Sequence, residues 1–153
     1  MNPRVRRFLR GLLVAVTGTG ALFGAMQLVP YGRAHSNPPV VAEPKWDSPR
    51  TRELAVRACF DCHSNETKWP TYAKVAPLSW VVQRDVNAGR EVFNFSEWHR
   101  PHDLAHYSGL SVRSHGMPPP QYRLAHPEAD LTDEEKHDLA RGLDATLKKP
   151  GQR

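Results

Sequence analysis

Both cysteines of the chain lie in one short motif, Cys59-Phe60-Asp61-Cys62-His63. Residues three apart on a helical turn share one face, so both thiols can reach the same flat ligand. The adjacent imidazole can then approach the centre of that ligand. C-x-x-C-H is the attachment pattern of c-type haem, in which both thiols bond covalently and His63 binds the iron. The motif predicts one covalent haem c.

Three other uses of the cysteine pair compete with haem. A structural zinc site needs a fourth ligand, and the chain has no second cysteine pair. A thioredoxin-like dithiol needs a βαβ context, which the sequence does not show. The third alternative is a plain structural disulfide. Two cysteines in 153 residues also exclude a disulfide-dense secreted scaffold.

Met117 is the expected second axial ligand of the iron. It lies in Gly116-Met117-Pro118-Pro119-Pro120, where the prolines stiffen the backbone around the thioether. Met/His ligation is an established haem arrangement that raises the reduction potential. The other two methionines are Met1 and Met26, which precede the motif. Met117 could instead be a gap-filling apolar side chain.

Histidines are the alternative distal ligands, and His115 is the nearest to Met117 in sequence. His99, His102 and His106 have spacings that also suit a second metal. No cysteine or carboxylate set completes that cluster, so we expect solvated loop histidines there. The sequence alone leaves both the sixth ligand and a second metal open.

The N-terminus has the pattern of a membrane anchor. Gly11 to Val29 is a 19-residue stretch without a formal charge, and it follows four arginines. A helix of this length rises about 28 Å, close to the ~30 Å hydrocarbon core of a bilayer. The positive-inside rule predicts a cytoplasmic N-terminus and a periplasmic remainder. The alternative is a cleaved signal peptide, for which Gly32-Arg33-Ala34 offers a cleavage site.

The charge distribution argues against a nucleic-acid partner. The chain has 21 Lys and Arg against 16 Asp and Glu. Five of these arginines lie in residues 1–33, which contain no acidic residue, so the remainder is neutral. We expect residues 1–30 to be an anchor or signal segment, residues 31–49 a Pro-rich linker, and residues 50–149 the haem-binding domain.

Helical signals dominate the predicted domain, so we expect an all-α fold. Ser48-Pro49 is a helix start, and a second helix is expected from about Pro77. Thr132 opens a capping box, followed by an apolar stripe. Long loops are expected between about residues 93 and 130. No segment shows sustained strand alternation.

The predicted domain is poor in large aliphatic side chains, and thin cores usually need a disulfide, metal or cofactor. Trp80 lies off the apolar stripe of the second helix. Trp80 could therefore pack against the haem edge or donate its N–H to a propionate, and the alternative is a core aromatic.

These motifs together resemble the bacterial haem-binding domain family of membrane-anchored, monohaem c-type cytochromes. The resemblance implies a cytochrome c-like helical fold, covalent haem on Cys59 and Cys62, and iron on His63. It does not identify a reaction. The matching segments are Val29–Arg33, Asn37–Val40, Ala58–Glu66, Trp69–Pro70, Ala76–Trp80, Val86–Arg90, Asn94–Trp98, Gly116–Pro119, Tyr122, His126–Pro127 and Leu131–Thr132.

The expected function is electron transfer by a single-pass protein of the cytoplasmic membrane whose haem domain faces the periplasm. Its redox partner protein is unidentified, and no substrate chemistry is expected. Two alternatives remain: a haem enzyme or gas/redox sensor with a labile sixth ligand, and a structural haem subunit of a membrane complex. The sixth ligand discriminates the carrier from the enzyme or sensor.

Overall fold

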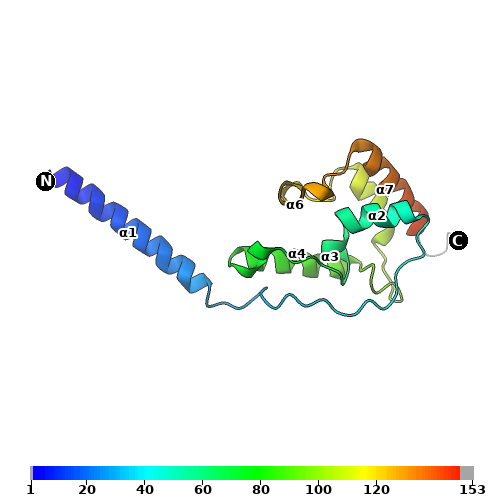
Figure 1. Ribbon diagram of the computed structural model, residues 1–153, viewed down its shortest axis with the longest axis horizontal. Coiled ribbons are helices and arrows are strands. Elements are labelled where there is room, and N and C mark those ends of the chain that lie inside the picture. The colour runs from blue at the N-terminus through cyan, green and yellow to red at the C-terminus, as the bar shows by residue number, and fades with distance from the viewer. Residues whose placement is uncertain (1, 149–153) are drawn as a thin grey trace. The chain divides into compact units, whose positions relative to one another are not determined.

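The computed structural model describes residues 2–148 (Figure 1). Within that range every regular element is a helix, and the one β pairing is an isolated bridge between Ala42 and Glu97. The all-α prediction is therefore confirmed for the described part of the chain. The helices in chain order are α1 Pro3–Met26, α2 Pro49–Ala58, α3 Phe60–His63, η1 Thr71–Lys74, α4 Leu78–Val92, η2 Ala105–Tyr107, α5 Ser108–Arg113, α6 Pro120–Ala125, η3 Pro127–Ala129 and α7 Asp133–Thr146.

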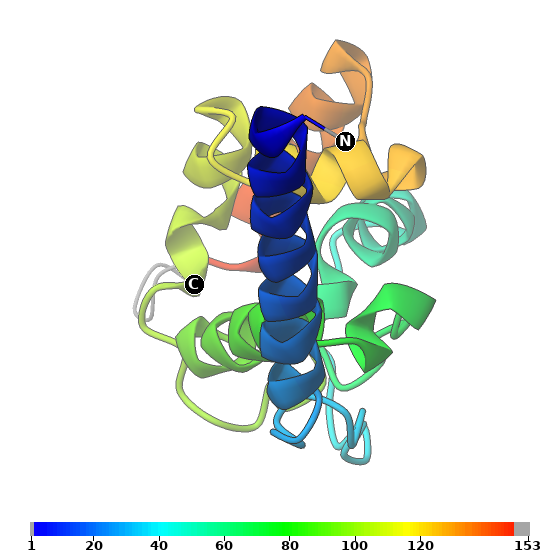
Figure 2. The same ribbon diagram turned by 90° about the vertical axis from the view of Figure 1, so that its left-hand side faces the viewer.

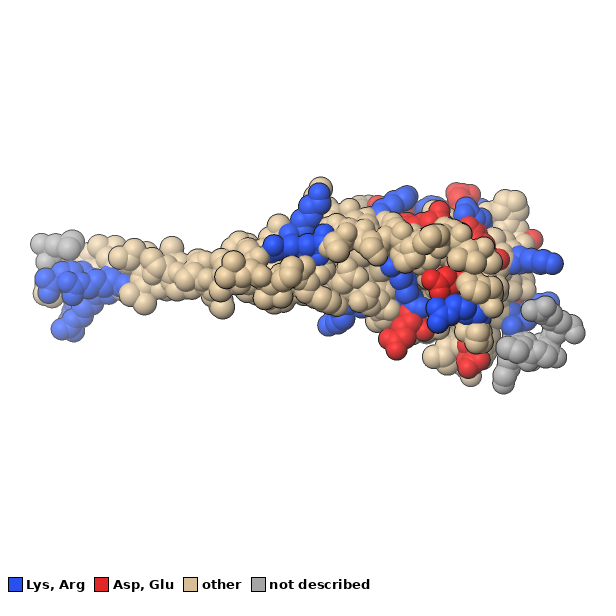
Figure 3. Space-filling view, turned by 90° about the horizontal axis from the view of Figure 1, so that it is seen from below, with Lys and Arg blue, Asp and Glu red and all other residues tan. Residues whose placement is uncertain are grey.

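Helix α1 carries the predicted membrane segment. It begins at Pro3 instead of Gly11, because Asn2 caps it and Pro3 takes the first helical position, and it ends at Met26 instead of Val29. Its apolar window has a mean hydropathy of 1.5 and none of it is buried. Figure 3 shows basic side chains at its N-terminal end and an uncharged surface along the rest. By length and composition, α1 can cross a membrane.

The chain packs as two units. One comprises Met1–His35 and Pro70–Arg84, and the other comprises Ser36–Trp69 and Asp85–Arg153. Helix α4 contributes residues to both units. The C-x-x-C-H motif, Met117 and α7 all belong to the second unit.

In the first unit, the residues after α1 are fixed to the segment around η1 and the start of α4. The Gln27 amide donates to the carbonyl of Ala76 at 2.9 Å and accepts from its N–H at 3.1 Å. Gly32 has φ +76°, and a Cβ there would overlap the carbonyl of Ser79. Only glycine combines this backbone conformation with so close an approach.

In the second unit, the two predicted helix starts are confirmed. Ser48 caps α2 by accepting from the N–H of Thr51 at 3.2 Å, with Pro49 at the first position. Thr132 and Glu135 form both halves of the capping box of α7. These local bonds satisfy N–H groups that have no partner inside the helix. The predicted apolar stripe of α7 is buried, namely Leu139, Leu143 and Leu147.

The prediction of long loops between residues 93 and 130 is only partly right. Residues 93–104 and 114–119 contain no helix, whereas the short helices η2, α5, α6 and η3 lie in the remainder of the stretch (Figure 2). None exceeds six residues. Such pieces are too short to repeat an apolar face, so periodicity cannot reveal them.

The Pro-rich segment predicted as a linker contains no helix before Pro49, where α2 begins, and its residues 41 and 42 pair with the second unit's own chain. The N–H groups of Val41 and Ala42 donate to the carbonyl of Ser96 at 2.8 and 3.1 Å. The N–H of Trp98 returns a bond to the carbonyl of Ala42 at 2.9 Å. These backbone bonds tie residues 41 and 42 to the chain that follows α4.

We expect Leu139→Ala to lower the free energy of unfolding of the second unit by about 2–5 kcal/mol, because this fully buried side chain would leave a cavity. Urea unfolding of the full-length protein in detergent, followed by circular dichroism, measures the change. Leu124→Ala is the control, because Leu124 is 87% exposed and its loss should matter by less than about 0.5 kcal/mol. Equal effects of the two changes would contradict this account of the core.

Candidate functional site

The C-x-x-C-H motif forms the junction between α2 and α3. α2 ends at Ala58, and Cys59 leads directly into α3. The N–H groups of Cys62 and His63 both donate to the carbonyl of Cys59, at 3.2 and 2.9 Å. Both cysteines are half-buried and neither forms a disulfide. One turn of chain therefore carries two free thiols and an imidazole.

The electrostatic surroundings keep both thiols protonated. Burial, and then the neighbouring Cys62, raises the pKa of Cys59 to about 12. Burial, followed by the charges of Asp61 and Asp85, raises the pKa of Cys62 to about 11. A catalytic dithiol needs the opposite shift, because the thiolate is its nucleophile. The direction of these pKa shifts does not favour thioredoxin-like exchange.

The imidazole of His63 is fixed by Phe93, the residue that follows α4. Its Nδ1–H donates to the carbonyl of Phe93 at 3.3 Å, and the two rings stack at 4.1 Å with 12° between their planes. Burial lowers the pKa of His63, while the carbonyls of Phe93 and Gly89 oppose that shift. A neutral imidazole that donates through Nδ1 keeps its Nε2 lone pair for a metal.

Helix α4 approaches the motif closely through Gly89. A Cβ at this position would overlap the carbonyl carbon and oxygen of Cys62 and crowd its Cβ. The next residue, Arg90, donates to the carbonyl of Ser64 at 2.8 Å and to the hydroxyl of Thr67 at 3.1 Å. The absence of a side chain at Gly89 thus lets α4 support the motif and the residues just after it.

A buried polar network anchors the chain that follows His63. The N–H of Asn65 donates to the hydroxyl of Ser96 at 2.9 Å, and its Nδ2 donates to the carbonyl of Pro39 at 2.9 Å. Asn94 donates to Oδ1 of Asn65 at 2.8 Å and accepts from the N–H of Ser96. Ser64, Asn65, Asn94 and Ser96 are all buried. Satisfied buried networks of this kind specify one arrangement of the chain.

Aromatic rings pack against the C-x-x-C-H motif through Phe60. Phe95 is fully buried, and the ring of Phe60, from inside the motif, stacks on it at 5.3 Å. Trp46 and Phe93 each lie 5.0 Å from Phe95. The sequence analysis missed this cluster because its members come from three separate segments.

Met117 follows α5 through a helix-ending turn. The N–H of His115 donates to the carbonyl of Val112, and the N–H of Gly116 donates to the carbonyl of Ser111 at 3.0 Å. This pattern is the Schellman motif, and His115 takes its left-handed position with φ +56°. The N–H of Met117 also donates to Ser111, at 3.1 Å, and its side chain is 44% exposed. His115 is exposed as well.

A side-chain hydrogen bond joins α6, which begins three residues after Met117, to the C-x-x-C-H motif. The hydroxyl of Tyr122, on α6, donates to Oδ2 of Asp61 at 2.6 Å. Asp61 lies between the two cysteines of the motif. The sequence analysis did not anticipate this bond, because 61 positions separate its partners. The only available signal was that both residues fall in segments resembling the family.

Trp80 belongs to the first unit. It is half-buried, and its buried Nε1 has no hydrogen-bond partner among residues 2–148. A contact with haem stays a prediction for this residue.

Two of the histidines in residues 99–106 contact neighbours of their own segment, whereas His99 is exposed. Nε2 of His102 lies 3.2 Å from the carbonyl of Glu97, and its ring lies 4.8 Å from that of Trp98. The ring of His106 lies 3.9 Å from Tyr107. Among the described residues, no three His, Cys, Asp or Glu side chains form a group that could hold a metal ion. This result gives no support to a second metal at the histidine cluster.

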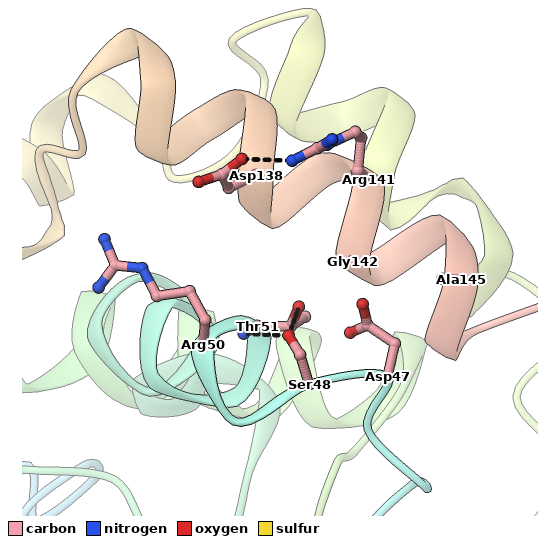
Figure 4. A pocket seen from close by; sticks show the side chains of 8 residues that line it. All are labelled: Asp47, Ser48, Arg50, Thr51, Asp138, Arg141, Gly142 and Ala145. Atoms are coloured by element: carbon pink, nitrogen blue, oxygen red, sulfur yellow. Dashed lines mark hydrogen bonds and ion pairs between the residues drawn. The ribbon is translucent and has the colours of Figure 1, made fainter.

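A hollow between α2 and α7 lies at the far end of α2 from the motif (Figure 4). Its lining includes Asp47 and Arg50 beside the start of α2 and the ion pair of Asp138 with Arg141 on α7. The ten residues of α2 rise about 15 Å between this hollow and Cys59. The residues that line this hollow are therefore too far from Cys59 to form part of the cysteine site.

The donor set of the motif fits haem better than zinc. Zinc requires both thiolates and the imidazole to converge on one point, and the described residues contain no such convergent group. Haem requires the thiols at the edge of a flat ring and the imidazole at its centre. An oriented His63 with Nε2 left as the acceptor, beside two free thiols, is compatible with that requirement.

Comparisons with known proteins agree with this chemistry. A family model described as "Haem-binding domain" matches residues 21–145. No curated protein matches the chain. No solved structure matches it. The family match includes the C-x-x-C-H motif, Met117, Tyr122 and most of α7. By its sequence, the chain belongs to the haem-binding domain family.

Proposed function

We propose that this protein is a membrane-anchored c-type cytochrome that transfers electrons through one covalently bound haem. The observation that carries the proposal is the geometry of His63 beside Cys59 and Cys62. Its Nδ1–H is held by the carbonyl of Phe93, which leaves Nε2 for the iron. Bound haem supplies a one-electron couple at its iron.

Each residue of the motif has a separate role in this proposal. Cys59 and Cys62 would each form a thioether with one vinyl group and so retain the haem in a small domain. His63 would hold the iron from the proximal side. Met117 would supply the opposite ligand, because it is the sole methionine after Met26. Its thioether would favour ferrous over ferric iron.

The properties of α1 and the charges around it support a periplasmic location for the second unit. α1 can cross a membrane, and Arg4, Arg6, Arg7 and Arg10 lie at its N-terminal end. Positive charge on that side favours a cytoplasmic N-terminus. The second unit would then lie outside the cytoplasmic membrane, facing a redox partner protein.

The alternative function differs from the carrier in the sixth ligand of the iron. A labile sixth position would suit a haem enzyme or a gas or redox sensor. The spectroscopic experiment on Met117 described below separates these functions.

Covalent attachment is tested by removing both thiols. We expect wild-type protein made with a haem-attachment system to keep its haem through acid-acetone extraction and denaturing electrophoresis. Cys59→Ala combined with Cys62→Ala should lose it completely, because no thioether can form. Leu124→Ala, an exposed change in the same unit, should behave as wild type. Wild-type protein that releases its haem on extraction, or that carries zinc, would overturn the proposal.

Met117→Ala should remove the distal ligand while the haem stays attached. We expect loss of the far-red Met–iron band, new CO binding by the ferrous form, and a reduction potential lower by about 100 mV or more, within the ~0.8 V that axial ligands span. Optical spectroscopy and a redox titration measure these changes. His115→Ala should leave all three near wild type. The reverse pattern would establish bis-histidine ligation, and CO binding by wild type would favour the enzyme or sensor function.

Fractionation and protease protection test the location. We expect the protein in the membrane fraction, with the second unit digested by protease added to spheroplasts. Protease on the periplasmic side should suffice for digestion, because α1 would be the one helix that spans the membrane. A soluble protein with its N-terminus at His35 would show instead that residues 1–34 are a cleaved signal.

A further inference from the structure

All three oxygen atoms of Asp61, two in the carboxylate and one in the backbone carbonyl, accept hydrogen bonds. Its Oδ1 accepts from the N–H of Lys68 at 2.8 Å, and its backbone carbonyl accepts from the hydroxyl of Thr67 at 2.7 Å. Its Oδ2 accepts from the hydroxyl of Tyr122 at 2.6 Å. The first bond orients the carboxylate, and the second ties the backbone of Asp61 to Thr67. Asp61 is therefore a fixed point inside the C-x-x-C-H motif, with one oxygen holding Tyr122.

Tyr122 is equally fixed on its own helix. Its ring stacks on that of His126 at 4.2 Å, with 12° between the planes. Burial and the bond to Asp61 raise the pKa of Tyr122 far above its usual value, so the hydroxyl stays a donor at any physiological pH. A short bond to a carboxylate, with both side chains already ordered, is among the stronger hydrogen bonds in proteins.

The chain between Met117 and Tyr122 is short and stiff. Three of its four intervening residues are prolines, Pro118 to Pro120, whose rings fix φ. Upstream, the carbonyl of Ser111 accepts from the N–H groups of both Gly116 and Met117. The segment from Gly116 to Tyr122, which we call the Met117-bearing segment, is thus hydrogen-bonded to the end of α5 on one side. On the other side, α6 is fastened to Asp61 through the hydroxyl of Tyr122.

We propose that Tyr122 is a positioning residue, whose hydrogen bond to Asp61 ties the Met117-bearing segment to the haem-attachment motif and thereby sets how firmly Met117 occupies the sixth iron position. This role rests on the proposed function, because it requires Met117 as the distal ligand. Tyr122 itself touches neither the iron nor a substrate. Without its hydroxyl, α6 would lose this tie to the motif, and Met117 would be displaced more easily by external ligands.

Tyr122→Phe tests the role by removing only the hydroxyl, since phenylalanine keeps the ring that stacks on His126. The full-length haem protein is titrated with imidazole in its ferric form, and its far-red band is recorded. Loss of one hydrogen bond to a charged acceptor corresponds to roughly tenfold to hundredfold in an equilibrium constant. We expect imidazole to bind tighter by about that factor, with a weaker far-red band and with the haem still covalently attached.

Two further variants make the result specific. Tyr107→Phe is the matched control, because Tyr107 is a half-exposed tyrosine of the same unit, and it should leave both readouts unchanged. Asp61→Ala removes the acceptor and should raise imidazole affinity as Tyr122→Phe does. The double variant should match Asp61→Ala alone, because that change has already removed the bond to Tyr122. Additive effects of the two changes would overturn the proposal.

Failure of this proposal is distinguishable from failure of the proposed function. If Tyr122→Phe leaves imidazole affinity and the far-red band unchanged while Met117→Ala abolishes the band, the positioning role is wrong and the cytochrome stands. If wild type lacks the band and Met117→Ala changes nothing, the assignment of Met117 is wrong, and the positioning role falls with it.

Discussion

The hydrogen bond from Nδ1–H of His63 to the carbonyl of Phe93 is the constraint on which the site depends. It selects the tautomer, orients the ring and leaves one nitrogen for a metal. The bond exists only because α4 ends beside the motif, and α4 can lie there only because Gly89 has no side chain to meet Cys62. A backbone position in α4 thus determines the chemistry of a histidine 26 residues earlier.

The surroundings of this bond show how a domain with few aliphatic side chains holds its motif rigidly. Rings take the place of aliphatic bulk, with fully buried Phe95 in contact with Trp46, Phe60 and Phe93. Directional interactions come from buried side-chain hydrogen bonds of Asn65, Asn94 and Ser96. Apolar packing alone would allow the chain after His63 to shift, whereas these bonds fix its register.

Local signals in the sequence predicted the parts of the structure that local chemistry determines. Ser48-Pro49 and Thr132 start helices because their side chains cap nearby N–H groups, and C-x-x-C-H is contained in one turn. The carbonyl of Phe93 and the bond between Asp61 and Tyr122 could not be predicted, since both depend on segments that meet only after folding. The short helices α5 and α6 escaped detection because six residues cannot establish a periodic apolar face.

The two sides of the site are held in different ways, and this difference bears on function. On the proximal side, His63 is fixed by a backbone carbonyl, a stacked ring and the close approach of α4, none of which a surface change can remove. On the other side, α6 contacts the motif through the hydroxyl of Tyr122. If Met117 is the distal ligand, as proposed, the haem would stay attached through the motif while the sixth position is tuned separately. A carrier and a sensor would then differ in the strength of the hydrogen bond between Tyr122 and Asp61, while the fold around the motif stays the same.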